Sequence, residues 1–273
     1  MSSFICPVCK NELLIHDKVL SCNNNHCFDI SKHGYVNLLQ SQKQSSKRHG
    51  DDKLMVCARK DFLDGGYYNT LLKKVLNVVD KYAKDNIRIL DAGCGECWYT
   101  ANIMAHLKKK NITASVCGID IARDALIIGK RRSNELELAV ASIFNIPAAD
   151  SSCDIVFNFF APVAGDEYKR ILKCDGILIR AIPLQFHLWE LKCSIYDTPY
   201  ENDDIDLSLD GFSLIERHEI RDVIRLPSNQ DIQNLFMMTP YYYKTSKADQ
   251  IKIDKLKTLD TKIEFGILVY KKD

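Results

Sequence analysis

Long apolar runs are missing from this sequence. No segment approaches the ~20 apolar residues of a membrane helix and none precedes Cys6, so we expect neither membrane insertion nor export. An excess of one charge is also missing: the net charge is +1 at pH 7, which argues against coating of nucleic acid by bulk electrostatics. Internal repeats and low-complexity tracts are absent. The 11 cysteines suit a reducing compartment, so we expect a cytoplasmic protein.

The most informative stretch that is present is an apolar strand running into a glycine-bearing turn, from Ile87 to Glu96. Asp91 precedes the two glycines of this turn, Gly93 and Gly95. The next predicted strand ends in Asp120, at a position where a carboxylate accepts hydrogen bonds from ribose hydroxyls. The pattern predicts a site for a nucleoside cofactor, with an acidic turn that binds nothing as the alternative.

The residues around this turn favour S-adenosylmethionine (SAM) over a dinucleotide. The dinucleotide fingerprint G-x-G-x-x-G needs a third glycine, and here that position is Trp98, which is too bulky for close helix contact. The carboxylates of Asp91 and Glu96 would repel a diphosphate, whereas SAM carries a sulfonium and an amine that attract them. We therefore expect SAM as the cofactor.

Cysteines near the N-terminus have the spacing of a zinc site. Cys6 and Cys9 are followed by Cys22 and then by His26, in the pattern C-x2-C-x12-C-x3-H. Zinc takes four such ligands in a tetrahedron, and two short-spaced pairs present them from successive turns. Because Cys27 adjoins His26, the residues alone leave an all-cysteine site open, and also ordinary reduced thiols. Four protein ligands would make the site structural.

The order of motifs predicts three parts: a zinc-binding domain over residues 1–38, a polar linker and connecting helix over 39–60, and a methyltransferase domain over 61–273. From Gln40 to Asp52 there is no large apolar residue, as expected of a solvated linker. Helical spacing follows from Leu54 to Leu63 and from Asn69 to Ala83. With 46% apolar residues, the chain can bury a full domain and a small one.

Strands and helices then alternate, which predicts an α/β fold with a doubly wound, Rossmann-like sheet. Ligands of such sheets bind at the carboxyl ends of the strands, so Gly93, Gly95 and Asp120 are expected on one rim. The segments from Phe212 to Arg217 and from Ile263 to Tyr270 are expected to add antiparallel strands. The predicted strands are 87–92, 114–119, 136–141, 153–160 and 176–182, and the predicted helices are 97–109, 122–132 and 165–173.

Three basic clusters are candidates for local RNA contact. One runs from Lys43 to Lys53 in the linker, and the others, Lys108–Lys110 and Lys130–Arg132, end two predicted helices. Phosphate contact is one reading of these clusters. For the last two the helix dipole is the stronger explanation, because it favours basic residues at helix C-termini.

Several short motifs along nearly the whole chain occur together in one arrangement. They are Cys6-Pro-x-Cys9, His26–Asp29, Gly34–Leu39, Ala58-Arg59 with Phe62-Leu63, Gly66–Tyr68, Leu90–Glu96 and His187–Lys192. In this combination the chain resembles the large-subunit (23S) ribosomal RNA guanine-N1-methyltransferases. The resemblance implies a class I SAM-dependent methyltransferase with a small N-terminal zinc domain that recognises a ribosomal RNA hairpin, acting as a homodimer.

The resemblance also implies roles for single residues. Cys27 becomes a bystander beside the metal site. The family usually has glycine where this chain has Cys97, and a glycine-containing turn where it has Pro183–Phe186, and both changes are expected to crowd the cofactor rim. The implied zinc ligands are Cys6, Cys9, Cys22 and His26, and the implied SAM contacts are Tyr68, Gly95, Glu96 and His187.

Methylation at guanine N1 displaces a proton, so an acceptor is needed. Glu190, one turn from His187 on a predicted helix, is our candidate base, with a helix cap or a lysine pair as the alternative. The segment Asn158–Pro162 ends the fourth strand and borders the expected acceptor pocket, where aromatic rings stack an extruded base, with an ordinary aromatic strand end as the alternative.

Two other functions stay open at this point. One is a catalytically impaired, zinc-dependent RNA-binding homologue, which the retained Asp91, Glu96 and Asp120 oppose. The other is a small-molecule SAM-dependent methyltransferase, which the basic linker opposes.

Overall fold

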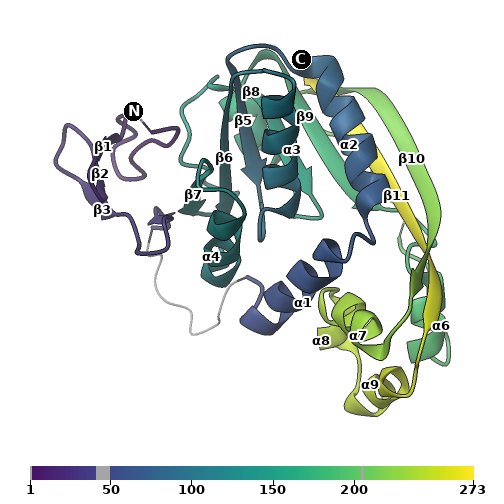
Figure 1. Ribbon diagram of the computed structural model, residues 1–273. Coiled ribbons are helices and arrows are strands. Elements are labelled where there is room, and N and C mark those ends of the chain that lie inside the picture. Colours follow the sequence, from purple (N-terminus) through teal and green to yellow (C-terminus); the bar gives the residue numbers. More distant parts are fainter. Residues whose placement is uncertain (1, 41–49, 204–205) are drawn as a thin grey trace.

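The computed structural model describes residues 2–40, 50–203 and 206–273. Most of the predicted polar linker and its basic cluster therefore lies outside the described residues. The centre of the molecule is an eight-stranded sheet with the order β10-β11-β9-β8-β5-β6-β7-β4 (Figure 1). Its strands are β4 (Val36–Asn37), β5 (Ile87–Ala92), β6 (Ala114–Asp120), β7 (Glu137–Val140), β8 (Cys153–Phe159), β9 (Leu172–Pro183), β10 (Phe212–Leu226) and β11 (Leu259–Lys272).

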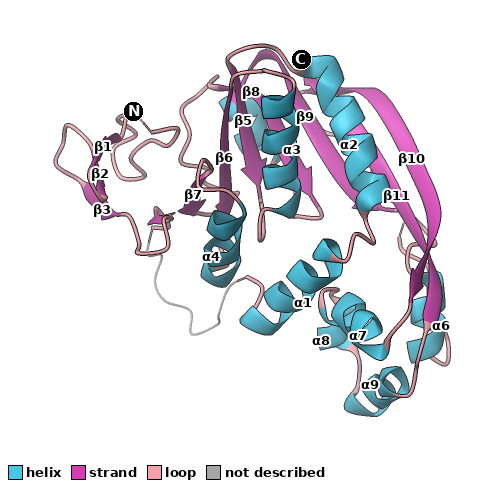
Figure 2. Ribbon diagram, viewed as in Figure 1, coloured by secondary structure: helices cyan, strands magenta, loops and turns pink. Residues whose placement is uncertain are grey.

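The sheet is doubly wound, as the alternating pattern predicts. From β5 the chain moves outward through β6 to β7 and then returns to β8 and β9, all in parallel, while β10 and β11 are antiparallel. The switch of direction lies between β5 and β8, which is where such sheets bind ligands. The helices are α1 (Lys53–Asp64), α2 (Asn69–Tyr82), α3 (Trp98–Lys109), α4 (Arg123–Arg132), α5 (Gly165–Ile171), α6 (Trp189–Ile195), α7 (Asn229–Met237), α8 (Tyr241–Lys244) and α9 (Lys247–Asp254) (Figure 2).

Alternating residues of the strands pack into two separate hydrophobic cores, one on each face of the sheet. In β5, Ile87 and Ile89 pack with the apolar residues of α2 and α3, whereas Leu90 and Ala92 pack on the opposite face with α5. This period of two is the expected consequence of strand geometry. Both faces are covered, so the carboxyl edge of the strands is the place where polar groups gather.

The predicted zinc-binding domain, called the zinc module below (described residues 2–38), is joined to this sheet directly. Its strands β1 (Leu14–His16), β2 (Val19–Ser21) and β3 (Cys27–Asp29) form an antiparallel sheet of their own, but β4 pairs in parallel with β7. The carboxylate of Glu137 on β7 accepts hydrogen bonds from the Ser2 hydroxyl at 2.8 Å and the Ser3 amide at 2.9 Å. Apolar residues of the zinc module, including Phe4 and Leu13, share the α5-side core.

Most predicted elements agree closely with the structure, and the differences have local causes. The strand predicted over 176–182 begins earlier, at Leu172 of β9, and Asp175 takes a left-handed conformation with φ 61° inside it. His187 lies in a turn before α6 and not on the helix, because Leu188 has φ 60°. The helices α7 to α9 have no sequence prediction. In the described ranges, no helix combines the length and apolarity needed to cross a bilayer.

Candidate cofactor site and metal centre

The predicted zinc ligands converge on one point. Sγ of Cys9 lies 3.6 Å from Sγ of Cys22, and Nδ1 of His26 lies 3.5 Å from Sγ of Cys6. Tetrahedral zinc, with Zn–S of about 2.3 Å and Zn–N of about 2.0 Å, requires ligand separations of roughly 3.5–3.8 Å. All four ligand atoms lie within 4.8 Å of one another, so the cluster fits zinc: Cys6, Cys9, Cys22 and His26.

Two tight turns hold these ligands in place. The Lys10 amide donates to the Cys6 carbonyl at 2.8 Å, and the Asn25 amide donates to the Cys22 carbonyl at 2.9 Å. Burial would raise the pKa of the Cys22 thiol, but backbone amides, above all that of His26, lower it to about 6. A thiol held near its thiolate form is the species that binds zinc.

Cys27 is not part of this cluster. Its side chain is exposed, and its thiol lies 3.6 Å from the Asn25 carbonyl. The geometry therefore selects three cysteines and one histidine over the all-cysteine site.

The predicted cofactor turn lies at the carboxyl end of β5, beside β6 and β8. Gly93 has φ 87°, and a methyl group placed on it would lie 2.7 Å from Cβ of Ala161, in the loop after β8. Gly95 has φ 54°, and a methyl group there would meet only Nη1 of Arg59, at 3.6 Å. Both glycines thus take a conformation that disfavours side chains. Gly95 faces open space, as a cofactor cradle requires.

Asp91 and Asp120 lie on this rim and have different hydrogen-bond partners. Asp91 is 2% exposed, and its Oδ2 accepts a hydrogen bond from the Thr100 hydroxyl at 2.5 Å. Its Oδ1 has no partner among the described residues, and burial raises the pKa of this carboxyl to about 7. The carboxylate of Asp120 accepts the Gly95 and Ala122 amides, both at 2.8 Å.

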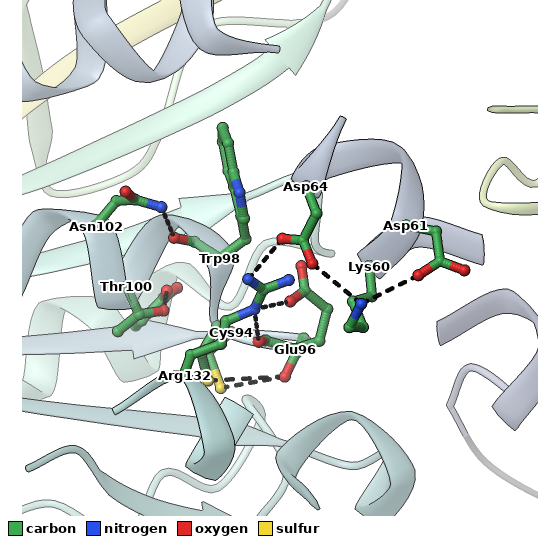
Figure 3. A network of polar contacts seen from close by, with 12 residues as sticks. Lys60, Asp61, Asp64, Cys94, Glu96, Trp98, Thr100, Asn102 and Arg132 are labelled. Atoms are coloured by element: carbon green, nitrogen blue, oxygen red, sulfur yellow. Dashed lines mark hydrogen bonds and ion pairs between the residues drawn. The ribbon is translucent and has the colours of Figure 1, made fainter. Parts of the chain in front are cut away.

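Glu96 is part of an ion-pair network that the sequence did not reveal. Its Oε2 lies 2.5 Å from Nε of Arg132, and Nη1 of Arg132 lies 2.7 Å from Asp64. Lys60 contacts Asp64 at 3.1 Å (Figure 3). Burial raises the pKa of Glu96, and Arg132 opposes that rise. The sequence suggests that Arg132 interacts with the helix dipole or with RNA. In the structure, its guanidinium neutralises the Glu96 carboxylate and connects α4 to α1 through Asp64.

Tyr68 and His187 meet from distant parts of the chain. The Tyr68 hydroxyl lies 3.4 Å from Nε2 of His187, and Nδ1 of His187 accepts the Glu264 amide at 3.1 Å. An accepting Nδ1 in a neutral ring puts the proton on Nε2. Burial lowers the pKa of His187 to about 3, so the ring is neutral at physiological pH.

Two aromatic residues complete the rim. Tyr99 lies beside Tyr68 and Glu96, and its buried hydroxyl has no partner among the described residues. Phe160 is 46% exposed, with φ 56°, and its ring centroid is 6.4 Å from that of Tyr99. Thr100 has no sequence signal beyond its place in the first turn of α3, and Tyr99 is predictable only as one of several aromatic residues that could stack a base or pack in the core.

Cys97 does not crowd the rim as expected. Its backbone has φ 62°, the conformation that the family's usual glycine favours. The side chain is fully buried, and a methyl group placed on Gly129 of α4 would lie 2.5 Å from its sulfur. The thiol therefore points into the core between α3 and α4, away from the cofactor.

Glu190, the predicted base, connects α6 to β11 through Lys262. Its Oε2 accepts the Lys262 amide at 2.7 Å, and its Oε1 lies 3.2 Å from the Lys262 ammonium. Burial would raise the pKa of Glu190, but these contacts hold it below the ordinary value. The base role stays a prediction.

The residues fit SAM on grounds of charge. Among the described residues, Asp91 Oδ1, the Tyr99 hydroxyl and Arg132 Nη2 are buried polar atoms without a hydrogen-bond partner, and such atoms are rare unless a ligand or water satisfies them. A carboxylate and a phenol suit the amine and the ribose of SAM, and an acidic rim would repel a diphosphate.

Comparison with known proteins agrees with this geometry. A family model described as RlmA, N-terminal, a zinc ribbon, matches residues 4–47, and one described as a methyltransferase domain matches residues 89–176. These two matches cover the zinc cluster and the strands that carry the cofactor turn.

Similar proteins carry consistent names. YxjB of Bacillus subtilis, provisionally named a 23S rRNA (guanine-N(1)-)-methyltransferase, is 28% identical over 98% of this chain and 96% of its own length. The 23S rRNA (guanine(748)-N(1))-methyltransferase of Streptomyces fradiae is 31% identical over 68% of this chain and 65% of its own. With its zinc ribbon and its SAM-dependent methyltransferase domain, the chain belongs to the family of 23S rRNA guanine-N1-methyltransferases.

Proposed function

We propose that this protein transfers the methyl group of SAM to N1 of a guanine in a hairpin of 23S ribosomal RNA. The observation that carries the proposal is the coupling of this zinc ribbon to this methyltransferase sheet. The two share strand pairing between β4 and β7 and share a core. A relative with the corresponding name matches the chain over 96% of its own length, so the coupling extends through both parts.

The zinc module is the proposed RNA-recognition element. It presents exposed apolar side chains at Val8 and Ile15, and the exposed lysines Lys10, Lys18 and Lys32, on a small scaffold that zinc makes rigid. Lysines supply phosphate contacts, and apolar side chains contact unstacked bases. Because this module packs against the main sheet, an RNA bound to it lies at a set position relative to the cofactor rim.

Phe160 is the proposed stacking platform for the target base. Guanine N1 lies on the pairing edge, so the base must leave its stack before it can be methylated. Phe160 is exposed beside the cofactor turn, and a left-handed conformation costs a bulky residue about 1–3 kcal/mol. Strain of this kind is typical of functional sites, and it aims an aromatic face outward where the base would arrive.

SAM supplies an electrophilic methyl group, and the protein positions the guanine relative to it. Holding the guanine nitrogen in line with that methyl group accounts for most of the rate gain of such enzymes. The Asn158 side-chain amide donates to the Pro162 carbonyl at 2.9 Å and to the Tyr168 hydroxyl at 3.0 Å, which fixes the loop that carries Phe160. Asn158 therefore supports the loop and does not itself face a base.

Glu190 remains the proposed proton acceptor. Its contacts with Lys262 make it a weak base in this arrangement, so the role requires that RNA binding loosen that pair. The homodimer and the cytoplasmic location are likewise proposals, which rest on the family and on the ribosomal substrate.

The two alternative functions are not favoured. The fit of the rim to SAM and the inward orientation of Cys97 oppose a catalytically impaired RNA-binding homologue. The ribosomal RNA names of the relatives oppose a small-molecule methyltransferase.

Tritiated methyl transfer from SAM to unmodified 23S RNA, followed by primer extension, tests the proposal. An N1-methylated guanine cannot pair, so a single reverse-transcription stop at a hairpin guanine is expected. Gly93→Leu is the inactive control, because any side chain there meets Ala161. RNA binding without incorporation would point to the impaired homologue, and methylation of small molecules alone would contradict an RNA substrate.

A further inference from the structure

The charges around the cofactor turn are unbalanced for SAM. The rim carries the carboxyl groups of Asp91 and Asp120 beside the Glu96–Arg132 ion pair, and these acidic groups suit the sulfonium, the amine and the ribose hydroxyls. SAM also carries a carboxylate of its own, which these groups would repel at close range. The site therefore needs a cation for that end of the cofactor.

Arg132 is already committed to two protein carboxylates. Its Nε lies 2.5 Å from Glu96 and its Nη1 lies 2.7 Å from Asp64 (Figure 3), and its Nη2 is buried with no hydrogen-bond partner among the described residues. Withdrawing it would leave the Glu96 carboxylate buried and unpaired, which is costly.

Arg59, on α1, lies over the open side of the turn. Its Nη1 is 3.6 Å from the position that a methyl group on Gly95 would occupy. Its influence also reaches four rim groups: burial raises the pKa of each, and the Arg59 guanidinium opposes the rise. The four groups are Tyr68, Glu96, Tyr99 and Asp120.

The current partners of Arg59 leave donors for a ligand. Nη1 donates to Asp51 at 2.6 Å, and Nη2 donates to the Met238 carbonyl, near the end of α7, at 3.4 Å. A guanidinium has five N–H donors in a planar fork, which matches the two oxygens of a carboxylate. The Asp51 carboxylate uses only Nη1 of this fork, so the guanidinium already lies beside one carboxylate at the rim.

We propose that Arg59 binds the methionine carboxylate of SAM. In this arrangement α1 closes the cofactor site, and the same guanidinium connects the cofactor to Asp51, at the start of α1, and to α7. The inference rests on the SAM dependence of the protein and is independent of which RNA is methylated.

A matched pair of ligands isolates the contact. SAM and decarboxylated SAM share the adenosine, the sulfonium and the amine, and they differ only in the carboxylate. Their dissociation constants are measured by titration calorimetry, without RNA, for the wild type and for Arg59→Gln, Arg59→Lys and Lys53→Gln. Lys53→Gln removes one positive charge from an exposed position of the same helix and serves as the control.

The wild type and Lys53→Gln are expected to bind SAM about 10- to 100-fold more tightly than decarboxylated SAM. Arg59→Gln is expected to bind the two ligands equally, with unchanged affinity for decarboxylated SAM, and Arg59→Lys to retain part of the preference. The proposal is overturned if the wild type does not discriminate, or if Arg59→Gln keeps the preference or loses both ligands alike. Since the assay contains no RNA, failure on 23S RNA and failure here are separate results.

Discussion

The Tyr68 hydroxyl lies 3.4 Å from Nε2 of His187, which joins a residue just before α2 to one just after β9. The imidazole is neutral in the fold because burial lowers its pKa to about 3 from an ordinary 6.5. An unfolded chain takes up this proton more readily, so the contribution of His187 to stability is present above pH 6.5. It is lost as the pH falls toward 3.

His187→Gln should therefore remove part of the acid sensitivity. We expect the variant to be less stable than the wild type at pH 7.5, with a deficit that shrinks by up to about 1.4 kcal/mol per pH unit on acidification. Urea unfolding of zinc-loaded protein at pH 5.5 and 7.5 measures this difference. A deficit that stays constant with pH would show that the ring is not held neutral.

Asp91 has the opposite sign. Its pKa is raised to about 7 from 3.8, so its contribution to stability is present below pH 3.8 and is lost as the pH rises through 7. Asp91→Asn should gain stability relative to the wild type between pH 5 and pH 7.5, while its SAM affinity falls. A variant destabilised equally at both pH values would contradict the raised pKa. Stability given up at a ligand site is a common trade.

The sequence was sufficient to predict the sheet and the metal site. β5, β6 and β8 are rich in apolar residues and lie next to turn signals, and local pattern alone marks such strands. The predicted zinc ligands are two short-spaced pairs, and their four ligand atoms lie within 4.8 Å of one another: Cys6, Cys9, Cys22 and His26.

The ion-pair network and the rim partners could not be predicted in the same way. Arg132 reaches Glu96 across 36 positions, and Tyr68 reaches His187 across 119, so neither pair leaves a periodic signal. The helix expected to include His187 begins only at Trp189, because Leu188 takes a left-handed conformation, which a leucine rarely adopts. Tertiary packing decides such positions.

Removal of one zinc ligand should unfold the N-terminal module. Cys22→Ser is expected to lose bound zinc and to lower the thermal midpoint, because structural zinc sites contribute folding energy outright. Cys27→Ser is the matched control, since this neighbouring thiol is exposed and outside the cluster. Metal content by mass spectrometry should be one zinc per chain for the wild type and the control. Zinc loss in Cys27→Ser would contradict the assignment of His26.

The Glu96–Arg132 pair should behave as a unit. Glu96 is 2% exposed, so Arg132→Gln leaves a buried carboxylate without its cation, at a cost of about 3–5 kcal/mol. The double variant Glu96→Gln with Arg132→Gln should recover much of this loss. A double-mutant cycle in urea measures the coupling, and simple additivity of the two single variants would mean that the pair carries no interaction.

Phe160 provides the sharpest test of the acceptor side. Phe160→Leu keeps an apolar side chain but removes the aromatic face, and stacking on such a face contributes about 1–3 kcal/mol per base. We therefore expect kcat/KM for RNA to fall about 5- to 150-fold, while the dissociation constant for SAM changes less than about twofold. Phe160→Tyr keeps the ring and should retain most of the activity. Equal losses in the Leu and Tyr variants, or a parallel loss of SAM affinity, would assign Phe160 to packing around Tyr99 and Phe265 instead of to the base.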